Sequence, residues 1–190
     1  MRIVAGKFRS RQLKSLKGLA LRPTSDMLRE TLFNILGPRV EGSRFLDLFA
    51  GTGAIGIEAI SRGAVLAIFV ENHSATVRLL RENLASLEIA SEARVITTDA
   101  AAAIARLEKE SAAAFDFVFL DPPYAHEKDY QATLCALEKS SLLTESALVI
   151  AEHHKKSALP KSIDRLKQIR VLVRGDAALS IYRLGAPSHS

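Results

Sequence analysis

The sequence has no tryptophan and only one cysteine, Cys135, among its 190 residues. A single cysteine excludes an intramolecular disulfide, and we expect Cys135 to lie on the apolar side of a helix over residues 129–137. The neighbouring His153 and His154 have no cysteine or acid beside them at metal-ligand spacing, so the sequence predicts no metal site.

Long apolar runs are also missing. The longest is the seven-residue stretch 64–70, whereas a membrane-spanning helix needs about 20 apolar residues. The chain begins Met1-Arg2 without the apolar core of a signal peptide. A hydrophobic content of 48% over this length suits one compact domain. We therefore expect a cytoplasmic monomer with no membrane partner.

Acidic residues are scarce at the beginning of the chain. Residues 1–44 contain ten Lys and Arg against three Asp and Glu, a net charge of +7, while residues 45–190 contain sixteen against eighteen, a net charge of −2. Apolar residues between the cations predict a hairpin about Gly6 that lies along phosphates. One alternative is a solvated charged face, and another is a structural arm whose Ile3, Val4 and Phe8 cover one edge of the sheet. If the phosphates belong to RNA, the candidate contacts are Arg2, Lys7, Arg9, Arg11, Arg22 and Arg29.

A helix is expected after this hairpin. It begins at Pro23 with Thr24 or Ser25 as its cap, and it ends at Gly37-Pro38. Residues 1–40 would then form an RNA-binding extension, residues 41–185 the main domain, and residues 186–190 a loose tail. In the main domain we expect helices at 74–86 and 99–110, a strand at 147–152, and an antiparallel pair at 169–173 and 179–184.

A glycine-rich loop follows the first expected strand, in the stretch 45–59. Gly51 and Gly53 allow a tight turn near a ligand, and Gly56 allows the next helix to pack closely on the strand. About twenty residues further on, a second strand ends at Glu71, an acid suited to the two hydroxyls of a ribose. This pattern alone fits a dinucleotide-binding dehydrogenase equally well.

Two further acids distinguish a site for S-adenosylmethionine from a site for NAD. Asp47, at the end of the first strand, would oppose a pyrophosphate but can hold a cationic amino-acid tail, which favours S-adenosylmethionine over NAD. Asp99, the last residue of an expected third strand at 94–99, is placed to accept a hydrogen bond from an adenine amine. Both acids should lie at the carboxyl edge of the sheet, where open α/β sheets bind ligands. The expected cofactor site comprises Asp47, Phe49, Gly51, Gly53, Gly56, Glu71, Asn72, Asp99 and Ala100.

The strand at 115–120 ends in Asp121, Pro122, Pro123 and Tyr124. The two prolines cannot donate ladder hydrogen bonds, so the strand must stop there. Asp121 and the Pro122 carbonyl can each accept one hydrogen from an exocyclic base amine, and the ring of Tyr124 can stack on the base. We predict these four residues as the catalytic site, against the alternative of a simple turn that closes a buried strand.

The chain resembles the bacterial RsmD family within the Rossmann-type S-adenosylmethionine-dependent methyltransferases. The motifs that carry the resemblance lie at residues 2–13, 22–34, 47–56 and 121–124, and they span nearly the whole chain. The resemblance implies an α/β fold with a seven-stranded, mostly parallel sheet in the order 3-2-1-4-5-7-6, helices on both faces, and an N-terminal β-hairpin and helix extension. It also implies methylation of the N2 amine of one guanine in 16S ribosomal RNA, either free or in a partly assembled small subunit.

Other functions share parts of these motifs. DNA adenine methyltransferases use the same Asp-Pro-Pro-Tyr but usually carry a target-recognition insertion, for which 190 residues leave little room. Protein-glutamine methyltransferases tend to have Asn at the position of Asp121. A non-catalytic RNA-binding or ribosome-assembly protein on the same fold is the third alternative, and the presence of Asp47, Glu71 and Asp121 argues against it.

Overall fold

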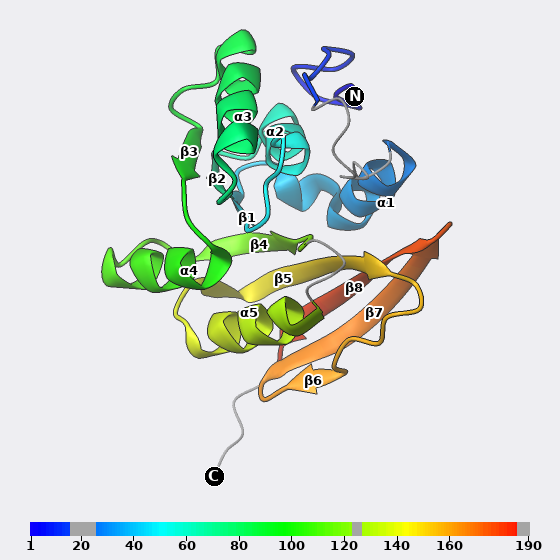
Figure 1. Ribbon diagram of the computed structural model, residues 1–190. Helices are drawn as coiled ribbons and strands as arrows, with labels where there is room; N and C mark the ends of the chain where they lie inside the picture. Colours follow the sequence, from blue (N-terminus) through cyan, green and yellow to red (C-terminus); the bar gives the residue numbers. More distant parts are fainter. Residues whose placement is uncertain (16–25, 123–126, 186–190) are drawn as a thin grey trace.

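In a computed structural model, the described residues, 1–15, 26–122 and 127–185, form one mixed sheet with helices on both faces (Figure 1). The strands are β1 (Arg44–Asp47), β2 (Leu66–Val70), β3 (Ala93–Ile96), β4 (Phe115–Leu120), β5 (Leu143–His154), β6 (Ser162–Ile163), β7 (Leu166–Arg174) and β8 (Ala177–Leu184). The helices are α1 (Asp26–Leu36), the 3-10 turn η1 (Gly37–Val40), α2 (Ala54–Ser61), α3 (Ser74–Ser86), α4 (Ala100–Lys109) and α5 (Glu127–Lys139).

The strand order is β3-β2-β1-β4-β5-β8-β7-β6. The first five strands of this order are parallel, and β8, β7 and β6 are each antiparallel to the preceding strand. The expected count of seven strands is corrected to eight, because the two residues of β6 pair with the beginning of β7. Without β6, the order is the one that the resemblance implied.

Apolar side chains fill both faces of the central strands, as expected for a parallel sheet that is covered on both sides. Because side chains alternate along a strand, Phe45 and Phe117 face the layer of α1, α2 and α3, whereas Leu46 and Val118 face α4 and α5. The carboxyl ends of β1, β2, β4 and β5 consequently meet at one edge, with helices above and below it.

The N-terminal residues 1–14, here called the arm, form a short hairpin-like loop without regular strands. Arg2 and Gln12 form an antiparallel bridge, flanked by backbone hydrogen bonds from the Ile3 amide to the Arg11 carbonyl at 3.0 Å and from the Leu13 amide to the Met1 carbonyl at 2.8 Å. The arm is nevertheless well packed, because Ile3 and Leu13 are buried in the same hydrophobic cluster as α1 and the sheet. The expected boundary at residue 40 therefore does not separate two cores, and residues 186–190 lie outside the described residues.

No helix within the described ranges combines the length and apolarity that crossing a bilayer requires.

Candidate functional site

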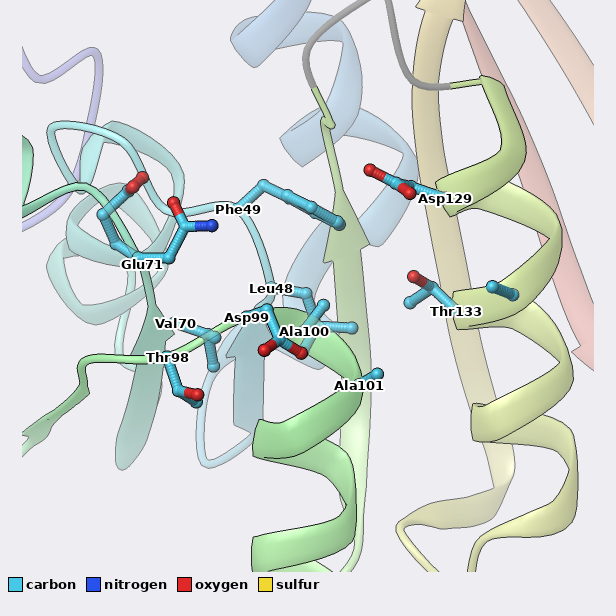
Figure 2. A pocket seen from close by; sticks show the side chains of 12 residues that line it. Leu48, Phe49, Val70, Glu71, Thr98, Asp99, Ala100, Ala101, Asp129 and Thr133 are labelled. Carbon is cyan, nitrogen blue, oxygen red and sulfur yellow. The ribbon is translucent and has the colours of Figure 1, made fainter.

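A pocket of about 280 Å³ opens at the carboxyl edge of the sheet. The ends of β1 and β2 form one wall, and α4 and the first turns of α5 form the others (Figure 2). Its lining residues are Leu48, Phe49, Val70, Glu71, Asn72, Thr98, Asp99, Ala100, Ala101, Asp129, Ala132 and Thr133. Five of the nine expected cofactor residues are in this set: Phe49, Glu71, Asn72, Asp99 and Ala100.

Asp47, at the end of β1, is only 1% exposed and does not line the pocket, although the next residue, Leu48, does. Its Oδ2 accepts a hydrogen bond from the Gly56 amide at 3.2 Å, whereas its Oδ1 has no partner among the described residues. Burial, with a smaller contribution from Glu71, raises the pKa of Asp47 to about 7. A buried carboxylate oxygen without a partner is costly, so this position is suited to a cationic group that would satisfy it.

Glu71 holds the glycine loop from the end of β2. Its Oε2 accepts from the Gly51 amide at 2.9 Å, and its Oε1 accepts from the His73 amide at 2.8 Å. A carboxylate has about four lone-pair sites, so two remain for ribose hydroxyls. The first turn of α2, which follows the loop, needs glycine at position 56, since a Cβ there would lie 2.3 Å from the ring of Phe69.

Asp99 belongs to a helix start and not to a strand end. Strand β3 stops at Ile96, and Asp99 caps α4 by accepting from the Ala102 amide at 2.8 Å. The bond uses one carboxylate oxygen and places the acid on the pocket wall across from α5 (Figure 2). A helix N-terminus with an acidic cap at this point presents both donors and an acceptor to a ligand.

Asp121 follows β4 on the same face of the sheet as Asp47. Burial and the charges of Glu152 and Asp47 raise the pKa of Asp121 well above its ordinary value. Glu152, near the end of the adjacent β5, is itself buried, and its nearness to Asp121 was not predicted from the sequence. Pro122 is buried beside Asp121, while the predicted catalytic residues Pro123 and Tyr124 lie outside the described residues.

Helix α5 contributes pocket residues that the sequence analysis did not identify. Asp129 and Thr133 are four residues apart and therefore share one helix face, which points into the pocket (Figure 2). The helix was predicted, but its pocket-facing side carries no motif. Cys135, which was expected in the core, lies on α5 with intermediate exposure.

The predicted RNA contacts are divided between surface and interior. Arg9 is exposed, and Arg2 lies with its Nε 3.6 Å from the Oδ2 of Asp26. Lys7 forms an ion pair with Glu92 at 2.9 Å. Arg11 donates a hydrogen bond to the Ser86 carbonyl at 3.1 Å.

Arg29 is not at the surface with these residues, because its side chain is 0% exposed. It donates to the Arg2 carbonyl at 2.7 Å and to Asp26 at 2.5 Å, so it holds the arm on α1. Arg22 lies outside the described residues.

Polar contacts within the sheet engage both ring nitrogens of His153. Its Nε2 lies 2.8 Å from the Ser180 hydroxyl and its Nδ1 lies 2.9 Å from the His154 carbonyl. Within the part of the chain that the structure describes, no three His, Cys, Asp or Glu side chains are grouped so that they could hold a metal ion.

The strand order, the glycine loop and the acids at the carboxyl edge define a Rossmann-like class I methyltransferase. The family described as Conserved hypothetical protein 95 matches residues 1–183, and the chain belongs to this family.

Among its relatives, a "Putative rRNA methyltransferase" of Bacillus subtilis is 37% identical, over 96% of this chain and 98% of the relative. "Ribosomal RNA small subunit methyltransferase D" of Escherichia coli is 35% identical, over 100% of this chain and 93% of the relative. The solved structure of a "Putative methyltransferase" from Escherichia coli superposes with a TM-score of 0.85 at 36% identity, over 98% of each chain.

Proposed function

We propose that the protein transfers a methyl group from S-adenosylmethionine to the exocyclic N2 amine of a guanine in 16S ribosomal RNA. The observation that carries this proposal is the match along the whole chain to relatives named as ribosomal RNA methyltransferases. The site supports it, because its carboxylates suit a cationic, ribose-containing cofactor and an amine acceptor. S-adenosylmethionine would supply a sulfonium methyl group. The N–C bond would form as the S–C bond breaks, S-adenosylhomocysteine would leave, and the methylated nitrogen would then lose one proton.

The residues at the carboxyl edge fit this cofactor. The unpartnered Oδ1 of Asp47 would accept from its ammonium group, and a cation there would lower the raised pKa of Asp47 so that the carboxylate is charged. Glu71 would accept from the ribose hydroxyls, and Asp99 from the adenine amine. The apolar walls at Leu48 and Ala100 would contact the adenine ring.

The acceptor residues position the guanine. Asp121 and the Pro122 carbonyl each accept one hydrogen of the amine, which directs its lone pair toward the cofactor, and the Tyr124 ring stacks on the base. Most of the rate enhancement then comes from positioning. Because the carboxylate of Asp121 faces the nitrogen on which positive charge grows, it also stabilises the transition state. The base must leave any stack to reach these groups.

The exposed cations of the arm, including Arg9, supply the RNA contacts in this proposal. Because the target base must leave its stack, a partly assembled small subunit suits the reaction better than a finished RNA duplex, so we propose that the protein, as a cytoplasmic monomer, acts on such a particle. Comparing methyl transfer to free 16S RNA and to partly assembled subunits would distinguish these substrates.

Mass mapping of ribosomal RNA tests the main proposal. RNA from cells that lack the protein should have lost one methyl group on a guanine of the 16S molecule, and purified protein with S-adenosylmethionine should restore it. A methyl group that appears on DNA adenine would identify the alternative substrate. An unchanged RNA map together with no cofactor binding would leave a non-catalytic protein on this fold.

A further inference from the structure

Asn83, on α3, is a fully buried polar residue at 0% exposure. Its Oδ1 accepts from the Lys14 amide at 2.8 Å, and its Nδ2 donates to the Lys14 carbonyl at 3.1 Å and to the Thr52 carbonyl at 3.0 Å. The orientation of this side-chain amide is determined by its neighbours, because two carbonyls can only accept and must face the nitrogen. Asn83 therefore joins the end of the arm to the glycine loop.

The connection continues to the pocket. Thr52 is the middle residue of the loop Gly51-Thr52-Gly53, and the Gly51 amide donates to Glu71 at 2.9 Å. Glu71 lines the pocket. One chain of hydrogen bonds thus leads from the proposed ribose contact, through the loop and Asn83, to the backbone of the arm.

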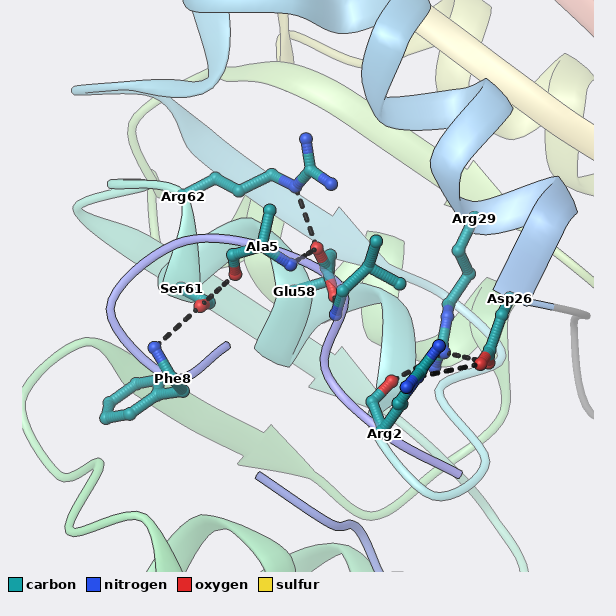
Figure 3. A network of polar contacts seen from close by, with 9 residues as sticks. Arg2, Ala5, Phe8, Asp26, Arg29, Glu58, Ser61 and Arg62 are labelled. Atoms are coloured by element: carbon teal, nitrogen blue, oxygen red, sulfur yellow. Dashed lines mark hydrogen bonds and ion pairs between the residues drawn. The ribbon is translucent and has the colours of Figure 1, made fainter. Parts of the chain in front are cut away.

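The rest of the arm is attached to the helix that begins at this loop. Glu58 of α2, at 0% exposure, accepts from the Val4 amide at 2.7 Å and the Ala5 amide at 3.0 Å (Figure 3). Ser61 accepts from the Phe8 amide at 3.0 Å and donates to the Ala5 carbonyl at 2.6 Å. Since α2 starts directly after Gly53, the loop and the arm are both attached to this helix.

We propose that Asn83 is a positioning residue that couples the two substrate sites, so that cofactor in the pocket strengthens RNA binding by the arm. This inference rests on the proposed function. A ligand that fixes Glu71 and the loop also fixes the Thr52 carbonyl in the position where it accepts from Asn83. The side-chain amide of Asn83 then fixes the backbone of Lys14. RNA that binds afterwards meets an arm whose end, at Lys14, is already held in place. Linkage requires that RNA strengthens cofactor binding by the same factor.

The coupling is measured as the ratio of two RNA dissociation constants. A labelled fragment of 16S ribosomal RNA is titrated with the protein, once alone and once with saturating S-adenosylhomocysteine, which has no methyl group to transfer. The wild-type ratio should be roughly 5-fold or more, at the lower end of typical couplings. Asn83→Ala should bring the ratio to about 1. Partial unfolding of a variant would raise this ratio, because the cofactor would refold part of the protein, so a loss of stability cannot imitate the expected fall to about 1.

Glu82→Gln is the matched control. Glu82 is next to Asn83 on α3 and pairs with the same Lys14, but through the exposed side-chain ammonium at 2.9 Å. This variant should keep the wild-type ratio. A wild-type protein that binds both ligands with a ratio of 1, or an Asn83→Ala variant that keeps the wild-type ratio, would overturn the coupling. A wild-type protein that binds neither ligand would instead contradict the proposed function.

A measurement on the wild-type protein covers the case in which Asn83→Ala does not fold. Hydrogen exchange at the Lys14 amide, which donates to Asn83, should slow several-fold when S-adenosylhomocysteine is added, although Lys14 itself does not line the pocket. Exchange at this amide that is unaffected by saturating S-adenosylhomocysteine would contradict the proposal without any variant.

Discussion

At the scale of single residues, Asp47, Asp121 and Glu152 bring three carboxyl groups together at the ends of neighbouring strands on one face of the sheet. Burial raises the pKa values of Asp47 and Asp121, and nearby carboxylates add to this effect, Glu71 at Asp47 and both Glu152 and Asp47 at Asp121. A cationic cofactor would lower these pKa values. The site is therefore costly to keep charged when it is empty and is stabilised by its ligand.

The first prediction concerns the pH dependence of stability. The folded-state pKa of Asp47, about 7, is above its ordinary value of 3.8. Its stabilising contribution is therefore fully present below about pH 4 and is lost as the pH rises through about 7. Between pH 5 and 8 this amounts to about 2 to 3 kcal/mol at 1.36 kcal/mol per unit. Urea denaturation at both pH values should show a smaller loss for Asp47→Asn, and equal losses would contradict the raised pKa.

The second prediction concerns Glu71. Glu71→Ala should weaken the binding of S-adenosylmethionine, because each well-formed charge-assisted hydrogen bond to a ribose hydroxyl contributes about 1.5 to 3 kcal/mol. The variant also leaves the Gly51 and His73 amides without their acceptor. Titration calorimetry gives the affinity, and Glu82→Gln, outside the pocket, serves as the control. Unchanged affinity would exclude Glu71 as a cofactor ligand.

The third prediction separates binding from chemistry. Asp121→Ala should abolish methyl transfer while leaving cofactor affinity nearly unchanged, because Asp121 is proposed to contact the acceptor amine. Tyr124→Phe should have a mild effect because the ring remains, whereas Tyr124→Ala should lose about 1 to 3 kcal/mol of base stacking. Single-turnover assays with 16S RNA measure the rate of methyl transfer by the Asp121 and Tyr124 variants. Substantial methyl transfer by Asp121→Ala would exclude Asp121 as the residue that accepts a hydrogen bond from the guanine amine.

At the scale of elements, apolar periodicity is enough to predict α3 at its observed bounds and the β7–β8 hairpin across Gly175-Asp176. Motif spacing likewise predicts the acids at the carboxyl edge. The arm is different, because its shape is determined by contacts with α2 that are more than 50 residues away in sequence. The same reason applies to Arg29, whose burial depends on how α1 and the arm pack, and to the face of α5 that lines the pocket.

The fourth prediction tests how the arm is held on α2. Gly6 has a φ of +84°, and a Cβ at this position would lie 1.8 Å from the Ser61 carbonyl oxygen. Gly6→Ala should therefore displace the arm and cost on the order of 1 to 3 kcal/mol. Gly42→Ala is the control, because Gly42 has a similar φ of +73° with no atom within 4 Å. Thermal melting should show the larger loss for Gly6→Ala, and equal losses would mean that the contact with Ser61 is unimportant.

At the scale of the whole molecule, the two substrates are assigned to different sides of the sheet. The pocket lies on the side of α4 and α5, whereas the arm packs with α1 and α2 on the other side. The acids Asp47 and Asp121 lie between them, at the edge where both sides meet. Exposed cations also lie on the side of the arm, which carries Arg2, Lys7, Arg9 and Arg11 at its surface.

The last prediction tests whether the cations of the arm bind RNA phosphates. Neutralising Arg9 and Arg11 together should weaken binding to 16S RNA fragments and reduce the slope of log affinity against log salt by about 0.7 to 0.9 for each phosphate that the arm no longer neutralises. Cofactor affinity should not change. Lys109 and Lys139 are exposed cations at the last turns of α4 and α5, so neutralising them removes the same charge far from the arm and should leave the slope unchanged. If the arm only covers the core through Ile3 and Leu13, the Arg9 and Arg11 variant will bind RNA with the wild-type slope, and titrations at several salt concentrations decide between these outcomes.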